Sequence, residues 1–92
     1  MRATRDQTRI TLCRTAPWNP ALRNSYRDRF AEHAGRFWKV SADSLDSMWW
    51  VEEIDRDGRP FMAGSEYVSP CGWALRLSEA RDLIADFCRQ KS

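Results

Sequence analysis

Several patterns that define common protein classes are missing from this sequence of 92 residues. No apolar run approaches the ~20 residues that a membrane-spanning helix needs. The N-terminal stretch MRATRDQTRIT lacks the apolar core of a secretory signal. Histidine occurs once, and there is neither a nucleotide-binding glycine loop nor a catalytic triad motif. We therefore expect one domain, residues 1–92, in a cytosol.

The cysteines are odd in number and far apart. Cys13, Cys71 and Cys88 form no C-x-x-C pair. A zinc site that used all three with His33 would have spacings unlike those of common zinc ligands, two of which usually come from one tight turn. We expect reduced thiols that pack as small apolar side chains, with no metal and no cofactor.

The chemically active residues form no catalytic pattern. His33 could meet a cysteine in three dimensions, but no orienting residue or nucleophile motif marks such a pair. Asp55, Asp57 and Glu66 occupy positions 1, 3 and 12 of a calcium loop. However, Pro60 stands at position 6, where that loop requires glycine. The sequence therefore predicts a protein that is not an enzyme and does not bind calcium.

Hydrophobic periodicity predicts the first half of the fold. Residues 7–14 alternate like a short strand within an N-terminal arm over 1–18. Asn19 followed by Pro20 is typical of a helix start. Apolar residues then recur every three or four positions, which predicts a basic amphipathic helix over 19–36. This stripe consists of Leu22, Tyr26, Phe30, Ala34 and Phe37.

The second half of the chain has strand patterns and one more helix. RFWKVSA, MWWVEEID, RPFMAGSEYV and WALRL are the predicted antiparallel strands of the segment 37–77, with turns at DRDG and SPCG. Ser78 is expected to cap a final helix over 78–90. The predicted order is β-α-β-β-β-β-α. This is an α+β fold in which two helices cover one face of an antiparallel sheet of three to five strands.

Charge is unevenly distributed, although the net charge is only +2. Residues 1–39 contain nine Arg or Lys and three acidic residues, whereas residues 40–66 contain two Arg and seven acidic residues. Thirteen of the fifteen cations are arginine, whose planar guanidinium pairs with carboxylates and phosphates. On the predicted helix these cations share the outer surface, because the apolar stripe faces the core. The resulting arginine ridge comprises Arg23, Arg27, Arg29 and Arg36, extended by Lys39, Arg5 and Arg9.

Two interpretations of the ridge stay open. It is either a solvated helix face with internal salt bridges or a cationic patch that binds phosphate or an acidic protein surface. Five tryptophans favour contact, because Trp and Arg are enriched at binding hot spots. Trp49 and Trp50 are neighbours on a strand and point to opposite faces, so we expect one of them to be exposed or covered by a loop. Both join the ridge as candidate partner-binding residues.

Three resemblances bear on function. The helix, three strands and helix over 20–90 are similar to a double-stranded-RNA-binding domain, although SEARDLIADF is acidic at its start, where that family has a lysine cluster. Residues 37–90 also resemble the arm-binding domains of phage integrases. As a small cytosolic chain with divided charge and no catalytic motif, the sequence resembles phage-encoded anti-CRISPR inhibitors.

The third resemblance implies a role in evading host defence within the bacterial cytosol. The protein would dock by protein–protein interaction on a CRISPR surveillance complex, a multi-subunit protein–RNA assembly. It would block target-DNA binding there and contact the nucleic-acid backbone. The alternative is a small phage-type DNA- or RNA-binding regulator, and a third interpretation is an antitoxin-like partner of one host enzyme. None of these involves a membrane or a small-molecule substrate.

Overall fold

The main sheet contains four antiparallel strands in the order β1-β2-β3-β6. The computed structural model describes residues 10–23, 27–43 and 47–90. The strands of the main sheet are β1 (Arg29–His33), β2 (Arg36–Asp43), β3 (Met48–Ile54) and β6 (Cys71–Ala74). All neighbouring strands pair antiparallel.

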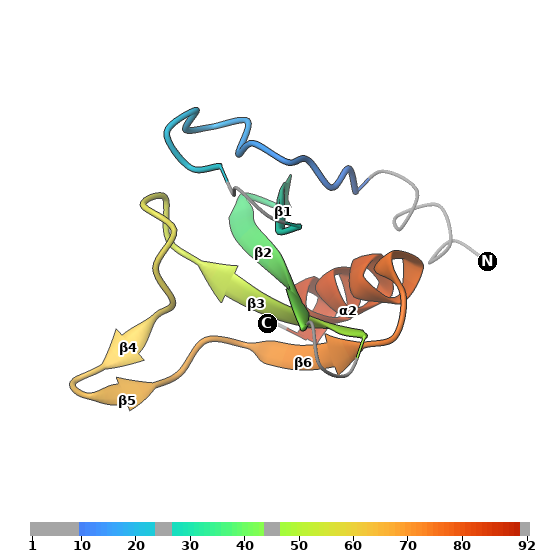
Figure 1. Cartoon of the computed structure of the whole chain (residues 1–92). Helices are drawn as coiled ribbons and strands as arrows, with labels where there is room; N and C mark the ends of the chain where they lie inside the picture. Colours follow the sequence, from blue (N-terminus) through green and yellow to red (C-terminus); the bar gives the residue numbers. More distant parts are fainter. Residues whose placement is uncertain (1–9, 24–26, 44–46, 91–92) are drawn as a thin grey trace.

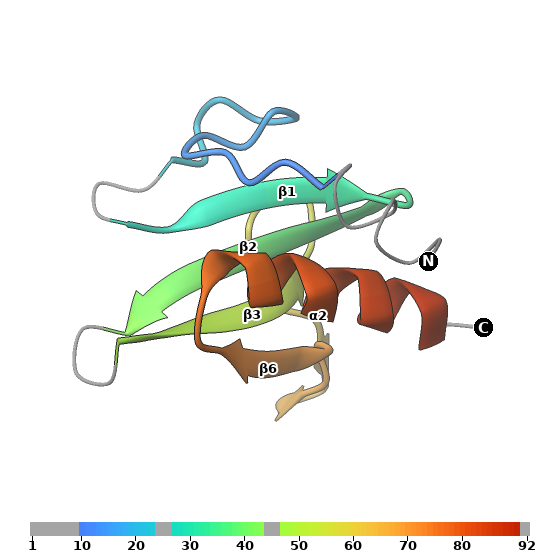
Figure 2. The ribbon, with the colours of Figure 1, turned by 90° about the vertical axis from the view of Figure 1, so that its right-hand side faces the viewer.

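A helix and a small hairpin complete the described fold. The helix α2 (Leu77–Gln90) covers one face of the main sheet, as Figures 1 and 2 show. The hairpin consists of β4 (Met62–Ala63) and β5 (Glu66–Tyr67) and is inserted between β3 and β6. No helix among the described residues is long and apolar enough to cross a membrane.

The α+β class, the antiparallel sheet and the C-terminal helix are confirmed, but the helix predicted over 19–36 is wrong. Within the described part of the chain, α2 is the only helix. Residues 29–33 instead form β1, which returns into β2 through Ala34 and Gly35. Both have positive φ, 56° and 73°, as in a type I′ hairpin turn.

The false helical stripe has a physical cause. Phe30 and Ala31 are adjacent and both buried, because the two faces of β1 are covered by different parts of the chain. Ala31 belongs to the core beneath α2, whereas Phe30 packs with Ala16 and Ile54 on the opposite face. A strand buried on both faces loses the alternation of period two, and its apolar residues then matched a helical spacing.

Two other predicted elements differ from the structure. Of the strand predicted over 7–14, residues 7–9 lie outside the described residues, and Cys13 forms an isolated bridge to Phe30. RPFMAGSEYV is not one strand: it folds back at Gly64, whose φ is 66°, and forms the β4–β5 hairpin. The predicted turn at Asp55–Gly58 is confirmed, with φ of 91° at Gly58.

The start of α2 also differs in detail. Leu77 is its first residue, so Ser78 lies inside the helix and is not its cap. The Glu79 carboxylate accepts a hydrogen bond of 2.9 Å from the Leu75 N–H and thereby fixes the residues that precede the helix. This carboxylate in the first turn also complements the positive end of the helix dipole.

Two apolar clusters lie on opposite faces of the sheet. The larger lies beneath α2 and includes Trp38, Val40, Val51 and Ile84, all without exposed surface. The smaller cluster lies on the other face, where residues 16–22 pack over Phe30, Phe37 and Ile54. These residues cover only part of that face, and Trp73 of β6 is 51% exposed there.

Candidate binding surfaces

The predicted arginine ridge is not one surface, because the helix that would carry it does not form. Arg36, on β2, is held by the protein itself. Its Nε and Nη2 donate hydrogen bonds of 2.9 and 2.6 Å to the two carboxylate oxygens of Glu53. Its Nη1 donates to the Phe87 carbonyl oxygen near the end of α2 at 3.3 Å. The hydrogen bond and charge of Glu53 raise the pKa of Arg36 further above its ordinary value.

The other ridge residues occupy separate places. The Lys39 ammonium lies 3.8 Å from the Asp28 carboxylate. Arg29 donates from Nη1 to the Arg27 carbonyl oxygen at 2.8 Å, which shapes the entry to β1. Arg23 is exposed on the loop that precedes residues 24–26. Arg5 and Arg9 lie outside the described residues. Their assignment to partner binding stays a prediction.

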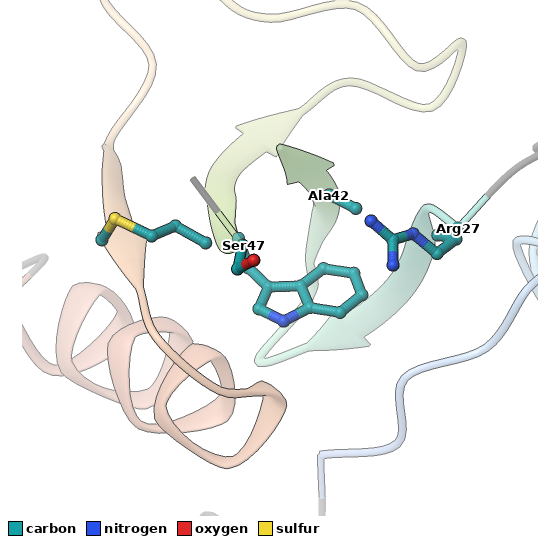
Figure 3. Close-up of a pocket in the computed structure, with 5 residues that line it drawn as sticks. Arg27, Ala42 and Ser47 are labelled. Carbon is teal, nitrogen blue, oxygen red and sulfur yellow. The ribbon is translucent and has the colours of Figure 1, made fainter. Parts of the chain in front are cut away.

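Arg27 and Arg29 meet Trp49 at one end of the sheet, and we call these three residues the arginine–tryptophan cluster. The Arg29 guanidinium lies 5.9 Å from the centre of the Trp49 ring. Arg27 points toward Ala42 (Figure 3) across a hollow of about 110 Å³. The hollow is lined by Arg27, Ala42, Ser47, Met48 and Trp49. It is smaller than the ~300–1,000 Å³ typical of small-molecule pockets, so it favours contact with part of a larger ligand.

The tryptophans are distributed differently from the prediction. Trp49 packs partly against the core beneath α2, and Trp50 lies on the opposite face. Both are half-buried. Trp50 is partly covered by Trp73 of β6, with ring centres 4.8 Å apart. Trp73 itself is 51% exposed, although sequence reasoning gave it no binding role. The alternation of Trp73 with Leu75 and Leu77 in WALRL predicts that they share a face, but it does not indicate whether that face is exposed.

The β4–β5 hairpin has an unusual concentration of exposed apolar side chains. Phe61, Met62, Tyr67 and Val68 are 40–51% exposed, and we call them the hairpin surface. Met62 pairs with Tyr67 on one face of the hairpin. Phe61 and Val68 lie next to each other on the other face, where the Val68 N–H donates to the Phe61 carbonyl oxygen at 3.0 Å. Both faces of the hairpin are therefore apolar.

The hairpin stands apart from the rest of the fold. Figure 1 shows it projecting on the side of the sheet away from α2. Among the described residues, the only extensive contact between β4 or β5 and another strand or helix is the contact between the two. An isolated two-stranded hairpin is at best marginally stable in water. A surface that covers this hairpin would therefore stabilise its conformation.

Three of the seven acidic residues in the segment 40–66 make hydrogen bonds within the fold. Glu53 is paired with Arg36, and a carboxylate oxygen of Glu52 accepts a hydrogen bond of 3.2 Å from the Trp50 indole N–H. An Asp55 carboxylate oxygen accepts the N–H groups of two turn residues. These acids shape the sheet and its turn, so the segment is not one acidic surface.

The cysteines and acids form no metal site within the described residues. Cys13, Cys71 and Cys88 are half-buried free thiols. Burial raises the pKa of Cys71, with a further contribution from the Glu52 carboxylate. Burial also raises the pKa of Cys88, partly offset by Arg36. Because nucleophilic attack requires the thiolate, these raised values disfavour a catalytic role for either residue.

Comparison with known proteins gives no relative for this chain. No family model matches, and no curated protein or solved structure matches significantly.

Proposed function

We propose that this protein is a non-enzymatic binding module that docks onto another protein through the hairpin surface. The supporting observation is that four large apolar side chains, 40–51% exposed, project on a hairpin that makes no extensive contact with another strand or helix of the described chain. Exposed apolar patches of this kind mark interaction sites on small proteins. A partner that covers the hairpin would also fix its conformation.

The magnitude of this contribution sets a limit on affinity. Covering the exposed parts of the four side chains would remove roughly 300 Å² of apolar surface from water, worth about 8 kcal/mol before costs. Association costs about 4–15 kcal/mol in lost motion and side-chain ordering. The hairpin alone therefore gives weak binding, and a stable complex would also include neighbouring residues.

The partner class that we propose is a bacterial CRISPR surveillance complex. In this proposal the protein acts as an anti-CRISPR-type inhibitor: it occupies a surface of the protein–RNA complex and prevents target-DNA binding. What supports this partner class is the resemblance in size, divided charge along the sequence and lack of a catalytic motif to phage-encoded anti-CRISPR inhibitors. The hairpin surface supports docking on protein rather than on nucleic acid, because Glu66 is its only charged neighbour within residues 60–70.

The experiment measures target-DNA binding by several purified surveillance complexes with and without the protein. One variant combines Met62→Ser with Tyr67→Ser, and a second combines Phe61→Ser with Val68→Ser, so that each hairpin face is tested separately. We expect inhibition by the native chain and a loss of at least tenfold in one of the two variants. Arg14→Ala, an exposed residue away from the hairpin, serves as the matched control, and circular dichroism checks that each variant is folded.

Two results would count against the proposal in different ways. Unchanged DNA binding across all complexes would reject the partner class. Inhibition that both hairpin variants retain in full would reject the hairpin surface as the docking site.

A second candidate function is binding of single-stranded DNA or RNA, and the arginine–tryptophan cluster favours it. Cations beside an aromatic ring are the usual means of holding a flexible nucleic-acid strand, since the ring stacks on bases and the cations meet phosphates. An electrophoretic shift with single strands and duplexes at low salt tests this function. We expect affinity to fall steeply with salt, and to fall further for Arg27→Ala than for the exposed control Arg14→Ala. No shift with the native chain would exclude this candidate.

A further inference from the structure

The two outer strands of the main sheet have different surroundings. The outer edge of β1 is covered by the chain itself, because Cys13 and Phe30 exchange two backbone hydrogen bonds of 2.8 and 2.6 Å. The strand β6 lies at the other end of the sheet. Within the described residues, no strand pairs with its outer edge. Figure 2 shows the blue segment that begins at residue 10 beside β1; the hairpin drawn below β6 forms its own two-stranded sheet and does not pair with β6.

The register identifies the backbone groups that β6 presents to this open edge. The Glu53 N–H donates to the Pro70 carbonyl oxygen at 3.0 Å, so this pair is hydrogen-bonded between β3 and the start of β6. Antiparallel pairs alternate between hydrogen-bonded and non-hydrogen-bonded, so Gly72 also faces β3. The N–H and C=O groups of Cys71 and Trp73 therefore point outward from the sheet.

The open edge has none of the usual protection against pairing. Natural outer strands carry charges, bulges or internal prolines that prevent another strand from adding. Residues 70–75, PCGWAL, contain no charge, and Pro70 stands only at the start. Trp73 and Leu75 are 51% and 61% exposed. The edge thus combines free backbone groups with apolar side chains.

We propose that β6 pairs antiparallel with β6 of a second copy of this chain, around a twofold axis at Gly72. Residue 71 of each copy then lies opposite residue 73 of the other. Both residues point their backbone groups outward, so the two pairs exchange four hydrogen bonds. The edge is self-complementary because these groups lie symmetrically about Gly72. Two copies can therefore pair around a closed twofold axis, in which each strand presents the same groups to the other.

Packing above the sheet accommodates this arrangement. The helix α2 contacts β6 and β3 more than the other strands. Two copies of α2 would then lie about two strand spacings apart, or about 10 Å, which is a normal packing distance for helices. The paired strands would form a continuous sheet of eight strands, twice the four of one chain.

Apolar side chains meet in the same register. Residues at equal distances from the axis at Gly72 lie opposite each other, so Leu75 of one copy lies opposite Ser69 of the other. Val68 is the neighbour of that serine. The hairpin projects on the side of the sheet away from α2 (Figure 1), and Trp73 faces that side because its neighbours Gly72 and Ala74 face α2. In the proposed pair the hairpin would lie against the added strand. With the strands, this contact would bury roughly 1,000 Å², the lower limit for a specific interface.

This inference goes beyond the proposed function and does not rest on it. The hairpin has two apolar faces, so one can meet the second copy while the other meets a target. Self-association is measured on the protein alone, and its failure would leave the inhibition experiment unaffected.

The test begins with sedimentation equilibrium of the full chain between about 1 and 300 µM. We expect the mass to rise from 10.8 kDa toward twice that value, with a dissociation constant on the order of 1–100 µM for so small an interface. Trp73→Pro removes an outward N–H and leaves the hydrogen bonds to β3 in place. We expect it to weaken dimerisation at least tenfold, and Trp73→Leu, which keeps that N–H, to weaken it less.

A second variant tests the register without weakening the strand. Gly72→Cys places two thiols across the proposed axis, at a spacing that permits a disulfide. A Cβ there would make only ordinary contacts with Leu83 and Phe87, at 3.5 and 3.7 Å. We expect covalent dimer under mild oxidation, well above the level of the native chain. Ala63→Cys on the exposed hairpin is the control and should not exceed that level.

Each remaining outcome overturns the proposal. A monomer throughout the concentration range would exclude the second copy as the occupant of the edge. A dimer that tolerates Trp73→Pro and gives no covalent product with Gly72→Cys would use a different surface.

Discussion

Arg36 offers the sharpest test of how this structure is held together. The sequence placed it on a binding ridge, whereas the structure uses it to join three elements. From β2 it binds the Glu53 carboxylate on β3 and the Phe87 carbonyl oxygen of α2. Its guanidinium also lies 5.0 Å from the Trp38 ring centre. We therefore expect Arg36→Met, which keeps much of the stem but removes the charge, to destabilise the fold.

The magnitude follows from burial. The side chains of Arg36 and Glu53 are 21% and 11% exposed. Removing one partner of a fully buried pair costs about 3–5 kcal/mol, because the other charge is left without compensation. Partial exposure reduces this cost to about 2–3 kcal/mol, and the lost bond to Phe87 adds about 1 kcal/mol. The total of about 3–4 kcal/mol is a large fraction of the stability of a small domain.

The assay is urea unfolding followed by tryptophan fluorescence, with thermal unfolding as a second measure. In a domain of this size about 1 kcal/mol corresponds to 4–8 °C, so we expect Tm to fall by more than 10 °C. Arg23→Met, at an exposed position of the predicted ridge, should change stability by less than about 0.5 kcal/mol. The double variant Arg36→Met with Glu53→Leu should recover most of the loss, because it leaves no buried charge. Equal effects of Arg36→Met and Arg23→Met would refute this reasoning.

Three further predictions concern single positions. Ala34→Gly should stabilise the fold by about 0.5–1 kcal/mol in urea unfolding, because φ at Ala34 is 56°; a loss of stability would contradict the type I′ turn. Burial raises the pKa of Cys71 and Cys88 above the ordinary 9.0, so the folded state favours the neutral thiols. Their contribution to stability is full below pH 9.0 and falls as pH rises further; urea midpoints should fall less steeply above that pH in a Cys71→Ser, Cys88→Ala variant, and equal slopes would contradict the shifts. The buried Trp38 indole N–H has no partner among the described residues. By thermal unfolding, Trp38→Phe should therefore cost only the cavity that the smaller ring leaves, about 1–2 kcal/mol, and Trp38→Ala about 3–5 kcal/mol. Equal losses in the two variants would contradict this expectation, because a loss common to both would point to a hydrogen bond of the indole N–H.

The elements that the sequence predicted well are those whose signals are local. β2, β3 and α2 lie close to their expected positions, and the turn at Asp55–Gly58 forms as predicted. In α2 the apolar face, the acidic first turn and the basic last turn all favour the helical conformation. A pattern of this kind requires no knowledge of distant residues, because the helix is buried on one side only.

The conformation of the segment 19–36 depends on contacts with distant residues, which its own sequence does not reveal. Phe30 and Ala31 are buried by residues 16–22 and by α2, which approach β1 from opposite sides. The partner of Arg36 is seventeen positions away at Glu53. Opposite charges that are separated in the sequence therefore pair in the folded protein. The exposure of the hairpin surface likewise follows from its projection beyond the sheet, and RPFMAGSEYV alone has the composition of a core strand.

Local periodicity and turn chemistry were enough to specify β2, β3, the turn at Asp55–Gly58 and the final helix. The tertiary structure alone determined which faces are covered, which charges are paired and which apolar side chains remain open to a partner. The physical reason is that burial and ion pairing depend on segments brought together by folding, whereas backbone preference depends on immediate neighbours.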